Sequence, residues 1–169
     1  DQRAVGGHPQ CPQPRLLGYG ESSDAHHMST PHPQGVGARL AMAAALRSAG
    51  VDASAVGYIN LHGTASRKND EVEARAVADM FPASTHAAST KGWTAHTLGA
   101  AGIVEAVIAL LALDTGLLPG NLNASVLDPE CGPQLRLDNA QGAVHYALSN
   151  SFGFGGNNCS LLFGAGGTA

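Results

Sequence analysis

The segment KGWTAHTLGAAGIVEA at residues 91–106 places a lysine and a histidine directly ahead of a run of small and apolar residues. Glu105 is the one charged residue in the apolar run that follows. A carboxylate buried without a partner is energetically costly, and Lys91 is the natural cation to pair with it. We therefore expect Glu105 to be buried and to form a salt bridge with Lys91. His96 lies between them and carries an imidazole that can donate, accept or exchange a proton near neutral pH.

A second histidine, His62, opens the stretch HGTASRKND, where a predicted strand ends. Taken alone, such a histidine is more often structural than catalytic. The glycine-rich GFGGNN at residues 153–158 is typical of a hairpin turn. GAAG at residues 99–102 fits either an anion-binding helix start or the close packing of small residues. Each segment is thus a weak signal by itself.

The remaining histidines and cysteines fall outside these segments. We expect six histidines in loops or at the surface: His8, His26, His27, His32, His86 and His145. The stretch HHMSTPH at residues 26–32 has no carboxylate or thiolate at a fitting spacing, so we predict no metal site there. Cys159 lies in the last predicted strand, and we expect a buried structural thiol rather than a nucleophile.

Hydrophobic periodicity predicts strands and helices in alternation. The expected order is a strand within residues 15–25, a helix over 36–49, a strand over 55–63, a helix over 69–81, a strand over 86–92, a helix over 98–113, and strands over 143–151 and 158–164. Asp70 and Glu73 have the spacing of a capping box at the start of the second helix.

This alternation predicts an α/β fold with a five-stranded, mostly parallel mixed sheet and helices on both faces. The two consecutive final strands predict one antiparallel member at an edge of the sheet. The helix over residues 98–113 is apolar nearly all round, so we expect it to be buried on both sides, with a partner domain or subunit beyond it. Residues 1–14 are rich in proline and predict a linker, which leaves residues 15–169 as the domain.

The composition indicates one soluble globular domain, since 44% of the 169 residues are hydrophobic and only 13% are charged. A net charge of −4 with nine scattered Lys and Arg residues argues against nucleic acid and anionic membrane as partners. Cys11, Cys131 and Cys159 lack the pairing of a zinc or disulfide framework and fit a reducing cytoplasm. No signal peptide opens the chain, and the apolar run at residues 103–113 is too short to span a bilayer. The first residue is Asp1, so we expect a piece of a longer polypeptide.

Three segments taken together resemble the C-terminal half of the β-ketoacyl-acyl carrier protein synthases. They are HGTASRKND at residues 62–70, STKGWTAHTLGAAGIVEA at 89–106 and NSFGFGGNNCSLLFG at 150–164. Their order and separations are those of the family, and the resemblance runs from Leu16 to Gly164. It implies the C-terminal half of a thiolase-like fold, in which the helix after the second histidine lies in a central layer.

The activity implied by this resemblance is a decarboxylating Claisen condensation. An acyl chain held on a cysteine as a thioester is attacked by the enolate that forms when malonyl-carrier protein loses carbon dioxide. His62 and His96 would hydrogen-bond the malonyl thioester carbonyl, so we expect their rings to converge on one point beside the turn of Phe154. Lys91 and Glu105 would organise the site. Phe154 would gate the acyl chain, and its backbone N–H would join an oxyanion hole.

The resemblance also implies substrate-binding residues and partners. Thr64 and Ser66 would line the phosphopantetheine arm, and Gly155 and Gly156 would shape the substrate turn. It implies no metal and no separate cofactor, because the substrates are carried on the phosphopantetheine of acyl carrier protein. The implied partners are acyl carrier protein, the missing N-terminal ketosynthase half and a second subunit in a homodimer or heterodimer. The pathway would make fatty acids, polyenes or polyketides in the cytoplasm.

Two small departures from the family pattern and one absence limit this reading. Ala95 stands where the family usually has glycine, and Ser66 where it often has a second threonine; both leave the chemistry possible. Nothing in the chain matches the surroundings of the family's nucleophilic cysteine, so we expect the chain alone to be inactive, whether it is a fragment, half of a split enzyme or a remnant of a pseudo-enzyme. The alternative function is a non-catalytic partner akin to a chain-length factor. Retention of His62, His96 and Lys91 favours the catalytic half, and thiolase is disfavoured because its C-terminal cysteine motif has no counterpart here.

Overall fold

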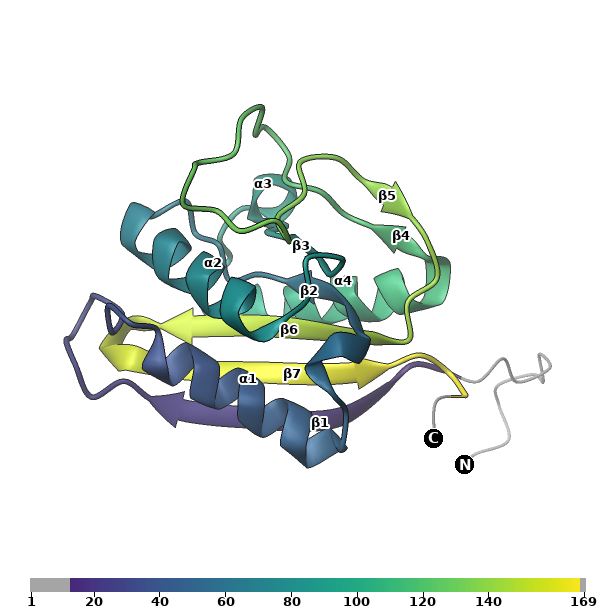
Figure 1. The fold of residues 1–169 in the computed structure, drawn as a ribbon, viewed down its shortest axis with the longest axis horizontal. Helices are drawn as coiled ribbons and strands as arrows, with labels where there is room; N and C mark the ends of the chain where they lie inside the picture. Colours follow the sequence, from purple (N-terminus) through teal and green to yellow (C-terminus); the bar gives the residue numbers. More distant parts are fainter. Residues whose placement is uncertain (1–12, 168–169) are drawn as a thin grey trace.

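The structure, a computed structural model, describes residues 13–167 (Figure 1). The predicted linker over residues 1–14 therefore lies almost wholly outside the described residues, as do His8 and Cys11. The elements begin with β1 at Arg15.

A five-stranded sheet forms the centre of the molecule, with strand order β1-β7-β6-β2-β3. Its strands are β1 (Arg15–Ser23), β2 (Val56–Asn60), β3 (His86–Ala88), β6 (Tyr146–Gly153) and β7 (Asn157–Gly164). Strand β2 pairs in parallel with β3 and β6, whereas β7 pairs antiparallel with both β6 and β1. Four strands therefore run one way, which confirms the predicted mixed α/β sheet.

The position of the antiparallel strand corrects the prediction. Strand β7 lies between β1 and β6 rather than at an edge. The reason is that β7 forms a hairpin with β6 on one side and offers its other side to β1, the first strand of the chain. A pattern of buried and exposed residues reports which faces are covered, but not which strands are neighbours.

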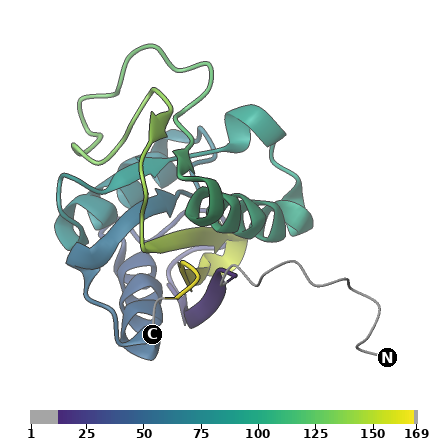
Figure 2. The same cartoon turned by 90° about the vertical axis from the view of Figure 1, so that its right-hand side faces the viewer.

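Helices cover both faces of the sheet, as predicted (Figures 1 and 2). Helices α1 (Val36–Ala49) and α2 (Arg67–Met80) pack on one face, and α4 (Ala101–Thr115) packs on the other. The alternation of side chains along β2 divides the core: Ile59 joins the α1 and α2 side, and Tyr58 joins the α4 side.

Short elements complete the chain. Helix α3 (Lys91–Thr94) is a single turn, and the 3₁₀ turns are η1 (Ala53–Ala55), η2 (Leu98–Ala100) and η3 (Phe154–Gly156). Strands β4 (Leu117–Leu118) and β5 (Ala140–Gln141) form a separate two-stranded ribbon that sequence reasoning missed, because two residues are too few to show a period.

Strand β1 and helix α1 meet backbone to backbone. A Cβ atom added at Gly18 would overlap the carbonyl oxygen of Ala45, and one added at Gly20 would overlap that of Ala41. Glycine is therefore required at both positions, because no side chain fits between the strand and the helix.

Helix α4 is buried on one side only, which differs from the predicted double-sided burial. Its inner side includes Glu105 and Ala109, whereas Ile103, Val107 and Leu111 are 67%, 46% and 53% exposed. None of the elements that the structure describes covers this outer side. By length and composition the stretch Leu98–Thr115 could cross a membrane, contrary to our estimate that the run is too short, but core helices pass the same test.

Candidate active site

The site lies where three parallel strands end. Strand β2 leads into the loop that begins at Leu61, β3 leads toward α3, and β6 leads into the turn η3. Because β2 pairs in parallel with both β3 and β6, their carboxyl ends meet at one edge of the sheet. This topology gathers His62, Lys91 and Phe154 from distant parts of the sequence.

The backbone of His62 is bound by a buried carboxylate, that of Glu73. Its backbone N–H donates to Oε1 of Glu73 over 2.9 Å, and the N–H of Gly63 donates to Oε2 over 2.8 Å. Asn150 donates to the same carboxylate from β6, over 3.2 Å. Burial raises the pKa of Glu73 to about 7 against the lowering effect of these three donors. Glu73 thus fixes the backbone that carries His62.

These contacts correct the predicted capping box. Helix α2 begins at Arg67, not at residue 69, and its N-cap Ser66 makes no side-chain cap. Asp70 accepts the N–H of Thr64 over 3.2 Å, and Glu73 is occupied by His62 and Gly63. Both carboxylates therefore accept backbone N–H groups of the loop after β2 and do not form a capping box at the start of α2.

The rings of His62 and His96 meet, as expected. Their centroids are 5.8 Å apart and their planes are nearly perpendicular, at 87°. His62 is buried and also contacts the ring of Phe152 at 5.9 Å, next to the turn of Phe154. His96 is exposed, and its Nδ1 accepts the N–H of Leu98 over 3.3 Å. In the neutral ring this leaves the hydrogen on Nε2, where it can be donated to a substrate.

Burial keeps His62 neutral. It lowers the pKa of this imidazole to about 3, with smaller contributions from the positive charge of Lys91 and from His96. His62 therefore offers one N–H and one lone pair at pH 7 and carries no charge. Its Nδ1 is buried and has no hydrogen-bond partner among the described groups.

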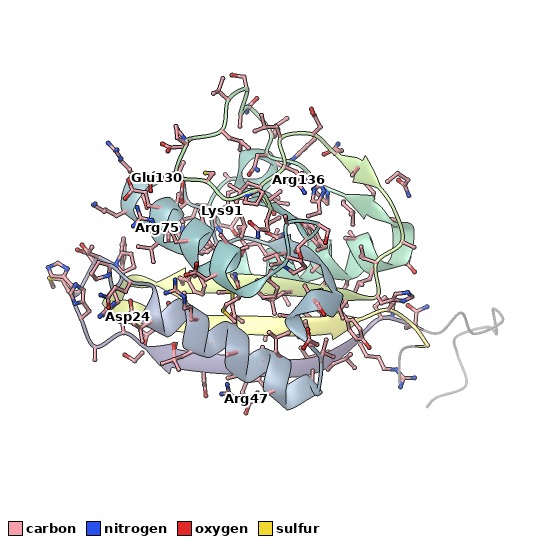
Figure 3. All side chains as sticks on the ribbon, viewed as in Figure 1. Asp24, Arg47, Arg75, Lys91, Glu130 and Arg136 are labelled. Atoms are coloured by element: carbon pink, nitrogen blue, oxygen red, sulfur yellow. The ribbon has the colours of Figure 1, made fainter. Side chains whose placement is uncertain are left out.

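Lys91 and Glu105 form the predicted salt bridge. Their side chains are only 7% and 1% exposed, and Lys91 also donates to the backbone carbonyl of His62. Lys91 is the first residue of α3, and Figure 3 shows it near the middle of the molecule, whereas Arg47 of α1 lies at the lower edge. Burial raises the pKa of Glu105 and the adjacent ammonium lowers it. The pair links α4 directly to the loop of His62.

The turn of Phe154 is fastened by the segment that follows β1. Gly155 donates its N–H to the carbonyl of Met28 over 2.7 Å, and Gly156 accepts the N–H of Asp24 over 2.8 Å. Phe154 itself is 83% exposed. Gly155 and Gly156 both have positive φ, 81° and 77°, which glycine adopts readily, so the two residues shape this turn.

Sequence reasoning missed the role of Asp24. Its side chain accepts from Asn158 over 2.9 Å and from the N–H of His32 over 2.7 Å, so it joins β7 to the loop before α1. A turn residue such as Asp directly after a strand is the one signal that could have indicated this contact.

A cavity of about 540 Å³ is lined by His96 and by Leu61 and Gly63, the two neighbours of His62 in the sequence. Its lining includes Thr64, Lys91 and His96, and the segment between β4 and β5 contributes both apolar and polar side chains: Leu122, Val126 and Leu127, with Asn121, Asn123 and Asp128. Thr64 and Ser66 share a hydrogen bond of 2.9 Å between their hydroxyls, and Ser66 is exposed. The cavity therefore offers both apolar surface and polar groups to a bound molecule.

Two residues outside the site differ from expectation. His86 is buried in β3, where its Nε2 hydrogen-bonds the carbonyl of Pro119 over 2.8 Å, so the prediction of a loop or surface residue is wrong. The segment around Gln134 covers this edge of the sheet and buries it. Cys159 is only half-buried, so it is not the fully buried thiol predicted from the sequence.

Comparison with known proteins identifies the family. The protein-family model described as "Beta-ketoacyl synthase, C-terminal domain" matches residues 15–125 of this chain. The chain belongs to the β-ketoacyl synthase family. Among curated β-ketoacyl synthases, the chain is 45% identical over 157 residues to "3-oxoacyl-[acyl-carrier-protein] synthase, mitochondrial" of Arabidopsis thaliana, a match covering 88% of this chain and 34% of the relative. It is 42% identical over 155 residues to "3-oxoacyl-[acyl-carrier-protein] synthase 2" of Vibrio harveyi, a match covering 88% of this chain and 37% of the relative.

Solved ketosynthases share the fold. The ketosynthase ApeO of Xenorhabdus doucetiae, in complex with its chain length factor ApeC, is matched with a TM-score of 0.86 and 45% identity, over 94% of this chain and 40% of that one. The ishigamide ketosynthase/chain length factor is matched with a TM-score of 0.85 and 32% identity, over 90% of this chain and 38% of that one. The chain spans little more than a third of the length of its curated relatives. It corresponds to the C-terminal part of a β-ketoacyl synthase.

Proposed function

We propose that this chain supplies the two-histidine half of a β-ketoacyl-acyl carrier protein synthase that performs decarboxylating Claisen condensation. The observation that carries the proposal is the meeting of the His62 and His96 rings above the buried Lys91–Glu105 pair. Two imidazoles at this separation suit two hydrogen bonds to one substrate oxygen.

The chemistry develops negative charge on that oxygen. The bond between the carboxylate carbon and C2 of the malonyl thioester breaks, carbon dioxide leaves, and the electron pair forms an enolate on the thioester oxygen. His62 and His96 donate hydrogen bonds to this oxygen and stabilise it. The enolate carbon then attacks the acyl thioester carbonyl, and the cysteine thiolate that held the acyl chain is expelled. The histidines need no net proton transfer in these steps.

The other site residues have supporting roles in the proposal. Lys91 binds the carbonyl of His62 and is itself held by Glu105, so the pair positions the first histidine. The backbone N–H of Phe154 serves the oxyanion of the acyl carbonyl, and its exposed ring gates the acyl chain. Thr64 and Ser66 line the path of the phosphopantetheine arm next to the cavity.

A second protein half completes the proposed enzyme. The open side of α4, with Ile103, Val107 and Leu111, supports a covering layer that also brings the nucleophilic cysteine. Acyl carrier protein is the proposed donor of both thioesters, and a ketosynthase homodimer or heterodimer is the proposed assembly. We propose residues 15–169 as the half-domain, residues 1–14 as a linker, and the cytoplasm as the compartment.

A partner subunit akin to a chain-length factor is the second candidate, because both structural relatives above are complexes that include such a factor. This subunit would need no donors to an enolate. The convergence of two histidines on one point favours the catalytic half.

Reconstitution tests the proposal. The chain, assembled with a ketosynthase half that bears the cysteine, should release carbon dioxide from malonyl-carrier protein. Loss of one oxyanion donor in His96→Ala or His62→Ala should slow this release by about 10² to 10³-fold. The control His145→Ala removes an exposed imidazole elsewhere and should leave the rate unchanged. Equal rates for the assembled wild type and His96→Ala would refute the catalytic assignment.

A further inference from the structure

His96 lies in the turn between α3 and α4, where two neighbouring residues adopt backbone conformations that most residues avoid. Ala95 has φ 59° and ψ 175°, a combination that is essentially restricted to glycine. Leu98, two residues after His96, has φ 53°. The histidine is therefore flanked on both sides by non-glycine residues in left-handed backbone regions. Strain of this kind persists only where surrounding structure enforces it, and it clusters at functional sites.

Little packing enforces the strain here. Ala95, His96 and Leu98 are all exposed, and Leu98 is 78% exposed. Within the turn, Ala95 donates its N–H to the carbonyl of Lys91 over 2.9 Å, and Leu98 donates to His96 over 3.3 Å. The contact that ties the imidazole to the rest of the site is the one with the ring of His62. The facing arrangement of the two histidines thus competes with the relaxation of Ala95.

We propose that Ala95 is a positioning residue that acts through His96; this inference rests on the proposed function. The methyl group of Ala95 disfavours the conformation in which His96 faces His62, so the turn exchanges between this conformation and a relaxed one with His96 turned away. Substrate that accepts a hydrogen bond from His96 selects the facing conformation. The alanine therefore weakens substrate binding without weakening the chemistry that follows.

The proposal predicts a split between KM and kcat. The apparent affinity of a site for its ligand is proportional to the fraction of molecules in the binding-competent conformation. Glycine at position 95 removes the methyl penalty and makes the facing conformation the resting state. Ala95→Gly should therefore lower the KM for malonyl-carrier protein by about five-fold, while kcat stays within about two-fold because saturated enzyme already faces His96 to the substrate.

A matched control separates positioning from stability. Gly50 ends α1 with φ 66°, and a Cβ atom added there would meet nothing within 4 Å. Gly50→Ala therefore introduces one left-handed alanine far from the site. In the double variant Ala95→Gly/Gly50→Ala, the strain added at residue 50 offsets part of the stability gained at residue 95, so it should unfold at a lower temperature than Ala95→Gly. Its KM should nevertheless stay as low as that of Ala95→Gly, and Gly50→Ala alone should leave KM unchanged.

The test uses the ketosynthase assembled from this chain and the cysteine-bearing half. A KM within two-fold of wild type in Ala95→Gly, a change confined to kcat, or loss of the effect in the double variant would each overturn the proposal. If the wild type shows no histidine-dependent decarboxylation, the proposed function fails by itself. Nuclear Overhauser contacts between the two imidazoles in the assembled, substrate-free protein then decide the inference: they should be stronger in Ala95→Gly, and equal intensities would overturn it.

Discussion

Replacing Lys91 by methionine tests whether the buried ion pair holds the site together. Methionine keeps much of the length and volume of lysine but removes the charge and the donors. In Lys91→Met the Glu105 carboxylate stays 99% buried without its cation, since its side chain is 1% exposed. The carbonyl of His62 also loses the ammonium donor. We therefore expect a large loss of stability from a single substitution.

The size of this loss follows from the burial of both partners. Breaking a buried pair by removing one member typically costs about 3–5 kcal/mol, because an uncompensated charge remains. Glu105→Gln should cost less, since Lys91 then keeps the carbonyl of His62 as an acceptor. The double variant Lys91→Met/Glu105→Gln removes both charges and should recover most of the stability that Lys91→Met loses.

The dependence on pH gives an independent check. Burial raises the pKa of Glu105, and Lys91 opposes this rise. Without Lys91 the pKa is higher still, so the folded state of Lys91→Met takes up a proton more readily than the unfolded chain. A raised carboxyl pKa contributes stability that is lost as pH rises. The deficit of Lys91→Met against wild type should therefore shrink as the pH is lowered.

Urea unfolding measures these quantities, with the single tryptophan, Trp93, as the probe. Its indole N–H donates to the carbonyl of Gly120, and the side chain is half exposed, so unfolding changes its environment. A deficit below about 1 kcal/mol in Lys91→Met would show that the pair behaves like a surface salt bridge. A double variant as unstable as Lys91→Met would show that the charge on Glu105 is not the cause.

Three further measurements follow from the structure. Burial raises the pKa of Glu73 from 4.5 to about 7, so this residue contributes stability that is present below pH 4.5 and lost as the pH rises through about 7; Glu73→Gln should flatten this slope by about 3 kcal/mol in unfolding measured at several pH values. The pKa of His62 is lowered to about 3, so its ring resonances should not shift between about pH 8 and pH 5, whereas an ordinary imidazole titrates in that range. The isolated chain should bind an apolar dye and self-associate, and Val107→Asp on the open side of α4 should reduce both in fluorescence and sedimentation experiments without lowering the unfolding temperature.

The residues of the candidate site were predictable to a large extent because their chemistry forces them together. A carboxylate inside an apolar helix needs a cation, and Lys91 is the partner that the structure supplies to Glu105. The meeting of His62 and His96 follows from the resemblance to a family rather than from periodicity. Local patterns also locate the three long helices and the five strands of the sheet to within a few residues.

Three other predictions were wrong because contacts with other segments of the chain outweighed the local pattern. Glu73 has ideal spacing to pair with Asp70, yet two backbone N–H groups of another segment bind it more favourably than the start of its own helix. The place of β7 depends on pairings that local sequence does not encode. The burial of His86 comes from a segment nearly fifty residues later, which closes over β3 through the backbone of Gln134. These three misses depend on contacts with other segments of the chain, which local patterns do not report.

The close approach of α1 to β1 at Gly18 and Gly20 makes a prediction about mutational tolerance. A methyl group at Gly18 or Gly20 would push α1 outward, since strand and helix already touch through their backbones. Helix α1 packs on α2, and α2 carries Glu73, the carboxylate that holds the loop of His62. In a saturation mutagenesis screen scored by activity, these two glycines should therefore be as intolerant of replacement as the histidines, although neither one comes near the substrate.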